Sequence, residues 1–252
     1  IKFSRQSFLL CFDDGYKDNY TNAFPILKQY QIPPTIFLCV DPIIKKTALW
    51  YDVIAEAIKT NKKDSIDLRK YKLKNYSIKT KYQKIIASKE IVFQAKYMKK
   101  SDRQQLIETI LNELGLATKE GNNFNKMLDW NDIKSMKDGG LSFGSHGIRH
   151  SILTTLTKEE IEYEINESKS ILEKAIGTEI KLFSYPNGAE QDFNDAIASI
   201  LKDNNYLAAC SLIDGINSNV SLFALRRYCV NEDMILGPFG RFSRSLFEAN
   251  TI

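Results

Sequence analysis

Histidine is the scarcest chemically useful residue in this sequence. The chain has 252 residues and only two histidines, His146 and His150. Chemistry that needs imidazole is therefore confined to one short segment. Cysteine is also rare and never forms a CxxC pair, which excludes a disulfide scaffold and favours a reducing compartment. The four cysteines lie in apolar, strand-like runs, where buried free thiols are expected; they are Cys11, Cys39, Cys210 and Cys229.

Long apolar runs are absent as well. No run approaches the roughly 20 apolar residues of a membrane span, and no signal peptide is visible. With 12 Gly, 6 Pro and 43% hydrophobic residues, collagen-like and disordered chains are excluded. We expect a cytoplasmic protein, in free form or at the inner face of the membrane. An extracytoplasmic location stays open because the sequence begins at Ile1 and not at Met.

Charge is unevenly distributed along the chain. Residues 59–100 carry 14 Lys or Arg against 3 Asp or Glu, a net charge of +11, while the whole chain is only +4. The rest of the sequence is therefore acidic, at −7. A basic block on an acidic body is a feature that the fold and function must accommodate.

Strands and helices alternate at both ends of the sequence, which predicts βα units and a parallel sheet. The expected strands are 7–13, 35–40, 141–145, 180–185, 206–212 and a last one near 225–230. The expected helices are 19–29, 130–137, 157–177, which Thr157 and Glu160 begin as a capping box, and 192–204.

The alternation stops between residues 43 and 126. This stretch contains helical patterns at 50–60 and 101–115, the second capped by Ser101, and no clear buried strand. We therefore expect one catalytic domain over residues 1–252 with a helical, Lys-rich insertion at about 43–126. The fold class is α/β, an incomplete or distorted (β/α) barrel, since no phosphate-binding Gly motif follows the first strand.

Three polar clusters follow the ends of predicted strands, where the chemistry of such barrels gathers. They are Asp13-Asp14-Gly15, His146 with His150, and Tyr185-Pro186-Asn187-Gly188. Each has an ordinary structural explanation, namely a turn, a pair of structural histidines, or a strand ending in a loop.

The clusters together favour a metal site. Two imidazoles four residues apart can converge on one ion, and one carboxylate completes a three-ligand catalytic zinc site. Neighbouring residues of a strand point to opposite faces, so Asp13 and Asp14 should have different environments. With Asp14 as the ligand, Asp13 is left as a base.

These clusters resemble the polysaccharide deacetylase family, which includes chitin and peptidoglycan deacetylases. The resemblance covers about residues 7–42 and 127–232 and leaves the insertion unmatched. It implies that Asp13 is the catalytic base and that Tyr185 supplies an oxyanion-hole amide. It also implies that a divalent metal, with Zn²⁺ as the expected ion, is held by Asp14, His146 and His150.

Two departures from the family pattern concern the base and the acid. Ser184 stands where many members have an Arg that orients the base, and we expect Arg227, rather than Arg226, to take that role. Many members also use a late His as general acid, yet no histidine follows His150. The general acid is therefore unassigned: Asp13 shuttles the proton both ways, another group serves, or activity is weak or absent.

The resemblance implies a metal-dependent hydrolase that removes N-acetyl groups from an amino-sugar glycan or its precursor. The alternatives are an O-acetyl carbohydrate esterase and a glycan-binding protein that keeps the metal pocket without turnover. Trp50, Asp52 and Asn187 are candidate substrate-binding residues, although helix packing explains the first two equally well. The sequence leaves open the sugar and its chain length, the metal and the oligomeric state.

The basic block at residues 59–100 has three interpretations. It is a solvated helical face, a docking surface for an anionic membrane or a lipid- or phosphate-linked glycan, or a nucleic-acid site. We expect no nucleic acid as partner, because the block has no recognisable motif and the rest of the chain is acidic.

Overall fold

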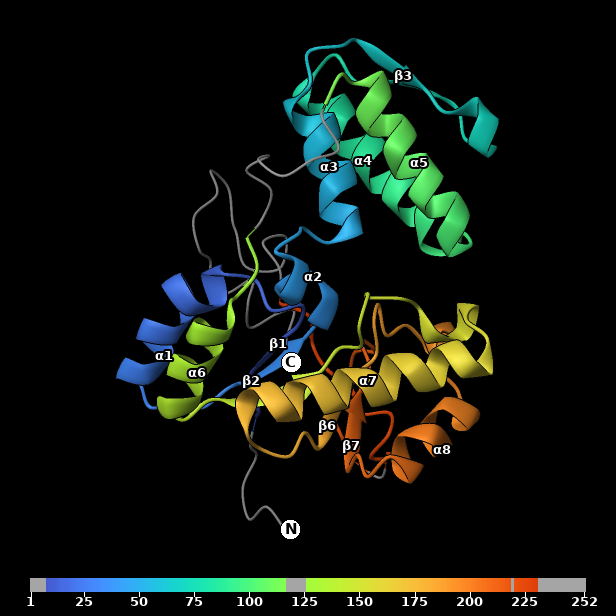
Figure 1. Cartoon of the computed structure of the whole chain (residues 1–252). Coiled ribbons are helices and arrows are strands. Elements are labelled where there is room, and N and C mark those ends of the chain that lie inside the picture. The colour runs from blue at the N-terminus through green and yellow to red at the C-terminus, as the bar shows by residue number, and fades with distance from the viewer. Residues whose placement is uncertain (1–7, 117–125, 219, 231–252) are drawn as a thin grey trace.

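The body of the protein is built on one parallel sheet of five strands in the order β1-β2-β5-β6-β7. The computed structural model describes residues 8–116, 126–218 and 220–230. The strands are short and curl into a half-barrel with helices around it (Figure 1), which confirms the expected incomplete (β/α) barrel. Their bounds are β1 Cys11–Phe12, β2 Thr35–Leu38, β5 Ser142–Ser145, β6 Leu182–Ser184 and β7 Ala208–Cys210.

Helices follow the strands, and some of them begin where the sequence supplies a capping residue. Thr157 caps α7, and Asp129 caps α6, each through a capping box that satisfies free N–H groups of the first turn. The stretch expected as one helix at 19–29 is a π-helical turn at 19–23 that continues into α1. The helices of the body are α1 Phe24–Gln29, α2 Val40–Lys45, α6 Trp130–Asp138, α7 Lys158–Ile176 and α8 Asp195–Asp203.

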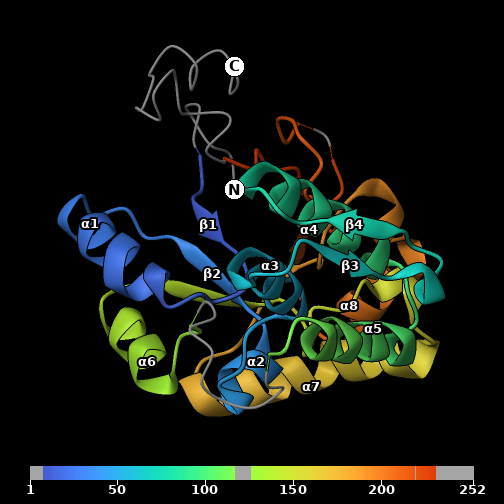
Figure 2. The same cartoon turned by 90° about the horizontal axis from the view of Figure 1, so that it is seen from above.

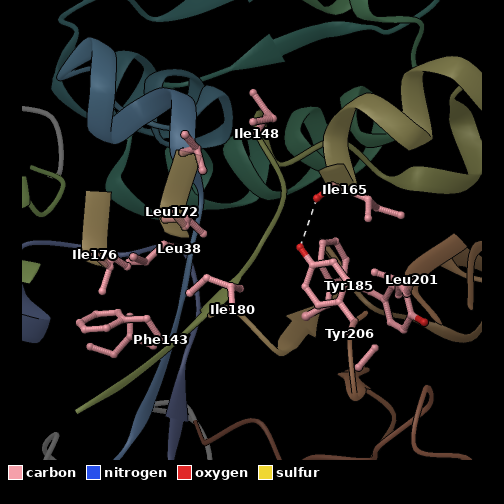
Figure 3. Close-up of a cluster of buried hydrophobic side chains, with 14 of the residues drawn as sticks. Leu38, Phe143, Ile148, Ile165, Leu172, Ile176, Ile180, Tyr185, Leu201 and Tyr206 are labelled. Atoms are coloured by element: carbon pink, nitrogen blue, oxygen red, sulfur yellow. Dashed lines mark hydrogen bonds between the residues drawn. The ribbon is translucent and has the colours of Figure 1, made fainter. Parts of the chain in front are cut away.

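The core of the body lies between the sheet and its helices. Apolar residues at helical spacing on α7, including Ile165, Leu172 and Ile176, pack against strand residues such as Leu38 and Phe143 (Figure 3). Tyr206 is buried beside them, and its hydroxyl donates to the Ile165 carbonyl at 3.2 Å. This core fixes the edge of the sheet at which all five strands end.

The insertion folds around a hydrophobic core of its own. In Figure 1 its elements form a separate group above the sheet, and Figure 2 shows β3 and β4 lying along one side of it. Its core includes Ile54, Ile91 and Ile110, all fully buried. Its elements are α3 Trp50–Thr60, β3 Ser65–Asp67, β4 Asn75–Ser77, α4 Lys81–Lys96 and α5 Lys100–Glu113.

Three sequence-based expectations about these elements were wrong. The insertion contains an antiparallel strand pair, β3 and β4, whose single buried residues Ile66 and Tyr76 are too few to show in a hydrophobic pattern. Ser101 does not cap α5, which begins at Lys100 after Lys99. The last strand, expected near 225–230, is reduced to one bridge between Leu225 and Cys210.

The four cysteines are free thiols, as expected, but they are not all buried. Cys39 is fully buried, Cys11 and Cys210 are half-buried, and Cys229 is exposed because the expected last strand does not form around it. Within the described residues, no helix combines the length and apolar character needed to cross a membrane. The division into one domain with an insertion stays a prediction.

Candidate active site

Asp13 and Asp14 lie at the end of β1, on the edge of the sheet where the strands finish. Asp14 has a φ of 73°, a left-handed conformation that Asp tolerates better than most residues. Gly15 follows with a φ of 87°, and a Cβ there would lie 2.9 Å from the Leu38 side chain. The chain therefore turns sharply between the two carboxylates and Gly15, and such strain is typical of functional sites.

His146 and His150 lie on the loop that follows β5, and buried groups fix this loop from beneath. Glu164 of α7 is 2% exposed and accepts the N–H groups of Ile148 at 2.6 Å and Arg149 at 3.1 Å. The His146 Nδ1 lies 2.7 Å from the Ser184 carbonyl, which places the ring proton on Nδ1 and leaves Nε2 as a lone pair. Both rings are thereby held at the strand ends.

The two histidines converge on Asp14. The Asp14 Oδ1 lies 3.5 Å from the His146 Nε2 and 3.3 Å from the His150 Nε2. One ligand atom from each of the three residues lies within 4.8 Å of the others. His150, like Asp14, has a left-handed backbone, with a φ of 54°. The described part of the chain thus contains a triad with the donor set of a three-ligand metal site.

The electrostatics of the triad fit a divalent cation. The Asp14 Oδ1 is buried and accepts no hydrogen bond from the described residues, whereas its Oδ2 accepts the Tyr51 hydroxyl at 2.8 Å. Burial opposes ionisation of Asp14, but His150, His146 and Tyr51 outweigh it and lower its pKa to about 2. Burial also lowers the pKa of His146, which favours the neutral form of this ring. An ionised carboxylate and a neutral imidazole are the forms that bind metal.

Asp13 has a different environment, as strand alternation predicts. Arg227 clamps it through two hydrogen bonds, of 2.9 Å to Oδ1 and 2.8 Å to Oδ2, and the Ser184 hydroxyl adds a third at 3.2 Å. Burial raises the pKa of Asp13, but His146 and Arg227 together lower it by more. The pKa of Asp13 is therefore below its usual value. Arg226 points elsewhere, to the Asp214 carbonyl.

Arg227 also bridges the open side of the half-barrel. Its Nε donates to the Ser211 carbonyl beside β7 at 2.8 Å, and its Nη1 lies 3.2 Å from the Cys11 sulfur in β1. The guanidinium therefore joins the two edge strands of the sheet, which are not paired with each other. This position explains why a residue so late in the sequence reaches a base at the end of β1.

The expectation that Tyr185 supplies an oxyanion-hole amide does not fit this geometry. The Tyr185 N–H donates to the Cys210 carbonyl at 3.0 Å as part of the sheet, and its hydroxyl donates to the Phe223 carbonyl inside the core. Pro186 has no N–H. Asn187 carries the next amide, with a left-handed φ of 66°, and this N–H donates to no acceptor among the described residues.

The candidate substrate-binding side chains are largely engaged within the protein. The Asn187 side chain accepts a hydrogen bond from Lys96 and donates one to Asp192. Asp52 accepts the Tyr16 hydroxyl at 2.8 Å. Trp50 packs its ring edge against Tyr51. Asp52 and Trp50 therefore lie close to the site, where they contact its neighbouring residues Tyr16 and Tyr51.

Glu164 and Tyr51 were not predicted as site residues. Glu164 interrupts the apolar stripe of α7 between Ile161 and Ile165, and a carboxylate on an inward helix face is a detectable signal of a buried partner. Tyr51 lies between the candidate residues Trp50 and Asp52 in the sequence. Its hydrogen bond to Asp14 joins segments 37 residues apart, which no local pattern reveals.

Fold and site together define a class of protein: an α/β half-barrel with a His₂Asp triad and a second, Arg-held aspartate at the strand ends. The family model for polysaccharide deacetylases matches residues 1–209. The chain therefore belongs to the polysaccharide deacetylase family.

Known relatives are distant in sequence. YxkH of Bacillus subtilis (strain 168), which is named as a polysaccharide deacetylase, is 22% identical over 246 residues, or 97% of this chain. The chain spans 59% of the length of that relative.

Solved structures share the fold. The deacetylase PplD of Streptococcus pyogenes, in complex with acetate, aligns with a TM-score of 0.58 and 19% identity, over 97% of this chain and 70% of its own. IcaB from Ammonifex degensii aligns with a TM-score of 0.55 and 15% identity, over 92% of this chain and 71% of its own.

Proposed function

We propose that this chain is a metal-dependent hydrolase that removes N-acetyl groups from amino sugars of a glycan. The observation that carries the proposal is the pairing of two aspartates with different partners. Asp14 faces two imidazole nitrogens, and Asp13 beside it is clamped by Arg227. Family membership supports the same activity, and so do the deacetylases among the solved structures that share this fold.

Asp14, His146 and His150 are the residues that would hold the metal. The buried, unpartnered Asp14 Oδ1 and the lone pair on the His146 Nε2 support this assignment. Zn²⁺ is our choice because two imidazoles and one carboxylate form a common catalytic zinc set. Bound there, it would supply Lewis acidity that polarises a carbonyl and lowers the pKa of water toward ~7.

Asp13 acts as the general base in this proposal. Its Oδ2 lies 4.0 Å from the His146 Nε2, next to the triad, and Arg227 and Ser184 fix the direction of the carboxylate. Asp13 accepts a proton from water as the water oxygen bonds to the acetyl carbon. The carbon–nitrogen bond then breaks, and acetate and a free amine are released. A positioned base contributes about 10²–10⁴-fold to such a reaction.

The Asn187 N–H is the oxyanion donor that we propose in place of the Tyr185 amide. It follows β6 directly after Pro186 and donates to no acceptor among the described residues. Lys96 and Asp192 hold the Asn187 side chain, so the peptide that carries this N–H is fixed before substrate arrives. Such preorganised donors stabilise charge that develops in the transition state.

The proton that the departing amine needs is returned by Asp13. The phenols of Tyr16 and Tyr51 are two further hydroxyl groups near the triad, but burial and the Asp14 carboxylate raise the pKa of both, and the Asp52 carboxylate also raises that of Tyr16. A phenol with a raised pKa is a poor acid. Asp13, once protonated, is the stronger donor beside the site.

Acetate release from matched glycans tests the proposal. Purified protein is incubated with N-acetylated and O-acetylated oligosaccharides, with and without a chelator, and acetate is measured. We expect release from N-acetylated sugars that stops with chelator and returns with Zn²⁺. Asp13→Asn should lower the rate about 10²–10⁴-fold while zinc binding is retained. Asp18→Asn, an exposed aspartate of the following turn, is the matched control and should keep the rate.

Each alternative corresponds to a different outcome. Release from O-acetylated sugars alone would identify an esterase. Binding of a glycan without release would identify a binding protein that keeps the pocket. Release that a chelator does not affect would refute the metal mechanism.

Docking of residues 59–100 on an anionic membrane stays a prediction. Helix α4 supports it, because its exposed face combines lysines with large apolar side chains. The apolar side chains are Tyr82, Ile85, Ile86 and Phe93.

A further inference from the structure

A basic pocket opens between the insertion and the body. Its volume is about 280 Å³, and it lies where α2, the start of α3 and the first two turns of α5 meet the loop of the triad histidines. Four cationic side chains and one carboxylate line the pocket. The charged residues are Lys45, Lys100, Arg103, Arg149 and Asp41.

Arg103 is the residue that makes this pocket unusual. It is only 8% exposed, and its guanidinium stacks 4.7 Å above the Trp50 ring. The guanidinium forms no hydrogen bond or ion pair with any described residue, and only the backbone N–H of Arg103 is engaged, by the Lys99 carbonyl. Burial lowers its pKa, and Glu164 counters this only in part, because that carboxylate already accepts two backbone N–H groups. A buried cation without a counter-charge is costly, which a bound anion would offset.

The other cations of the pocket are not equally available. Lys45 pairs with Asp41 at 2.6 Å, and Arg149 lies between Asp41 at 3.6 Å and Glu164 at 3.5 Å. Lys100, by contrast, has no carboxylate partner in the part of the chain that the structure describes. Arg103 and Lys100 therefore remain as the two cations that face the pocket without a counter-charge.

The first turn of α5 borders the pocket, because Lys100 and Arg103 line it. Lys100 is its first residue, and no side chain caps the helix. The N–H groups of an uncapped first turn, in a helix of 14 residues, favour a negatively charged ligand. The Trp50 Nε1 is a further buried donor that has no acceptor among the described residues.

We propose that this pocket binds an oxyanion, a phosphate or carboxylate group, through Arg103 and Lys100. It lies one aromatic residue from the triad: the Trp50 ring is 5.4 Å from that of Tyr51, which is 5.1 Å from that of His150. If the proposed deacetylase function holds, the oxyanion is a substituent of the glycan, held while a neighbouring acetyl group is cleaved.

Anion binding is tested first and without reference to catalysis. Titration of the full chain with inorganic phosphate and with glucuronate, followed by calorimetry, should show saturable binding. Lys100→Gln and Arg103→Gln should each weaken it at least about tenfold, the effect of one lost charge-assisted hydrogen bond. Lys99→Gln removes the same charge from the adjacent exposed position outside the pocket and should change binding less than about twofold.

Arg103 also packs on Trp50, so its variant needs a check of folding by circular dichroism. Lys100→Gln carries the test if that variant unfolds, because Lys100 is exposed. No saturable binding to the wild-type protein, or equal weakening by Lys99→Gln, would overturn the proposal.

The source of the oxyanion is tested with two N-acetylated oligosaccharides, one neutral and one bearing phosphate or uronate. Lys100→Gln should raise KM for the charged substrate and leave KM for the neutral one unchanged. Equal KM values for both substrates in the wild type would show that the pocket binds a free anion. Failure of acetate release from both would refute the proposed function and leave the titration result intact.

Discussion

The body and the insertion of this protein are built by different rules. The body packs one parallel sheet against helices and carries every predicted catalytic residue: Asp13 and Tyr185 follow β1 and β6, and Arg227 reaches Asp13 from outside the strands. The insertion packs three helices and two strands around a separate apolar cluster and carries the basic excess of the chain. It contacts the site through a few side chains: Tyr51 to Asp14 and His150, Asp52 to Tyr16, and Lys96 to Asn187.

This difference separates the groups that we propose to react from the groups that surround them. The reacting groups that we propose all come from the acidic body, so the positive charge of the chain says nothing about the reaction. The insertion contributes aromatic and cationic groups that surround the site. We therefore infer that the insertion recognises or positions the substrate of the proposed reaction, and each prediction below tests that division.

The largest effect is expected at Arg227. Arg227→Met leaves the Asp13 carboxylate buried without its two hydrogen bonds, so we expect acetate release to fall about 10²–10⁴-fold. Arg226→Met is the matched control, because Arg226 contacts the Asp214 carbonyl and not Asp13. Its rate should stay within about twofold of the wild type. Equal losses in both variants would show that Arg227 has no special role at the base.

Much of the body was predictable because its signals are local. Apolar strands, the Thr157 capping box and the polar clusters at the strand ends all fall within a few residues of sequence. The choice of Arg227 over Arg226 came from the family resemblance, and the geometry supplies its reason: this side chain spans the gap between β7 and β1.

What sequence reasoning missed depends on contacts between distant segments. The use of the Tyr185 N–H by Cys210, which leads us to propose Asn187 as the oxyanion donor, depends on the register of β6 with β7. The β3–β4 pair buries one side chain on each strand, which leaves no periodic pattern. Both features arise from tertiary pairing and not from local propensity.

The next effect tests whether the two hydrophobic cores open separately. Ile165 in the body and Ile91 in the insertion are both 0% exposed, and Ile→Ala at either should cost about 2–5 kcal/mol. All four cysteines lie outside residues 43–126. Labelling of the buried Cys39 thiol, followed by mass spectrometry, therefore reports opening of the body alone.

We expect Ile165→Ala to accelerate Cys39 labelling by roughly two orders of magnitude, since each 1.4 kcal/mol is about tenfold in an opening equilibrium. Ile91→Ala should leave that rate unchanged while hydrogen exchange increases in α3, α4 and α5. Faster Cys39 labelling in both variants would show that body and insertion unfold as one cooperative unit.

Tyr51 is the point at which the insertion touches the triad. Tyr51→Phe removes the hydroxyl that donates to the Asp14 Oδ2 and keeps the ring against His150. Loss of one such supporting hydrogen bond typically weakens metal affinity about 10–100-fold. Zinc titration against a competing chelator measures the zinc affinity of each variant. Tyr163→Phe, an exposed tyrosine of α7, is the control and should bind zinc as the wild type does. An unchanged affinity in Tyr51→Phe would leave the insertion without influence on the metal.

The smallest effect concerns the charges of the insertion. Lys74 and Glu90 form an ion pair of 2.7 Å with side chains that are 60% and 35% exposed. Lys74→Gln should therefore change the free energy of unfolding by less than about 1 kcal/mol. Two opposing effects decide the sign of this change. Loss of the pair destabilises the insertion, while removal of one cation from a segment with a net charge of +11 relieves repulsion.

Salt screens both effects, because the Debye length falls from ~10 Å at about 0.1 M to ~3 Å at about 1 M. Urea unfolding at the two salt concentrations should thus give a difference between wild type and Lys74→Gln that shrinks toward zero. A larger, salt-independent loss would mean that the basic residues hold the insertion together, and the division between a packed core and a charged presenting surface would fail.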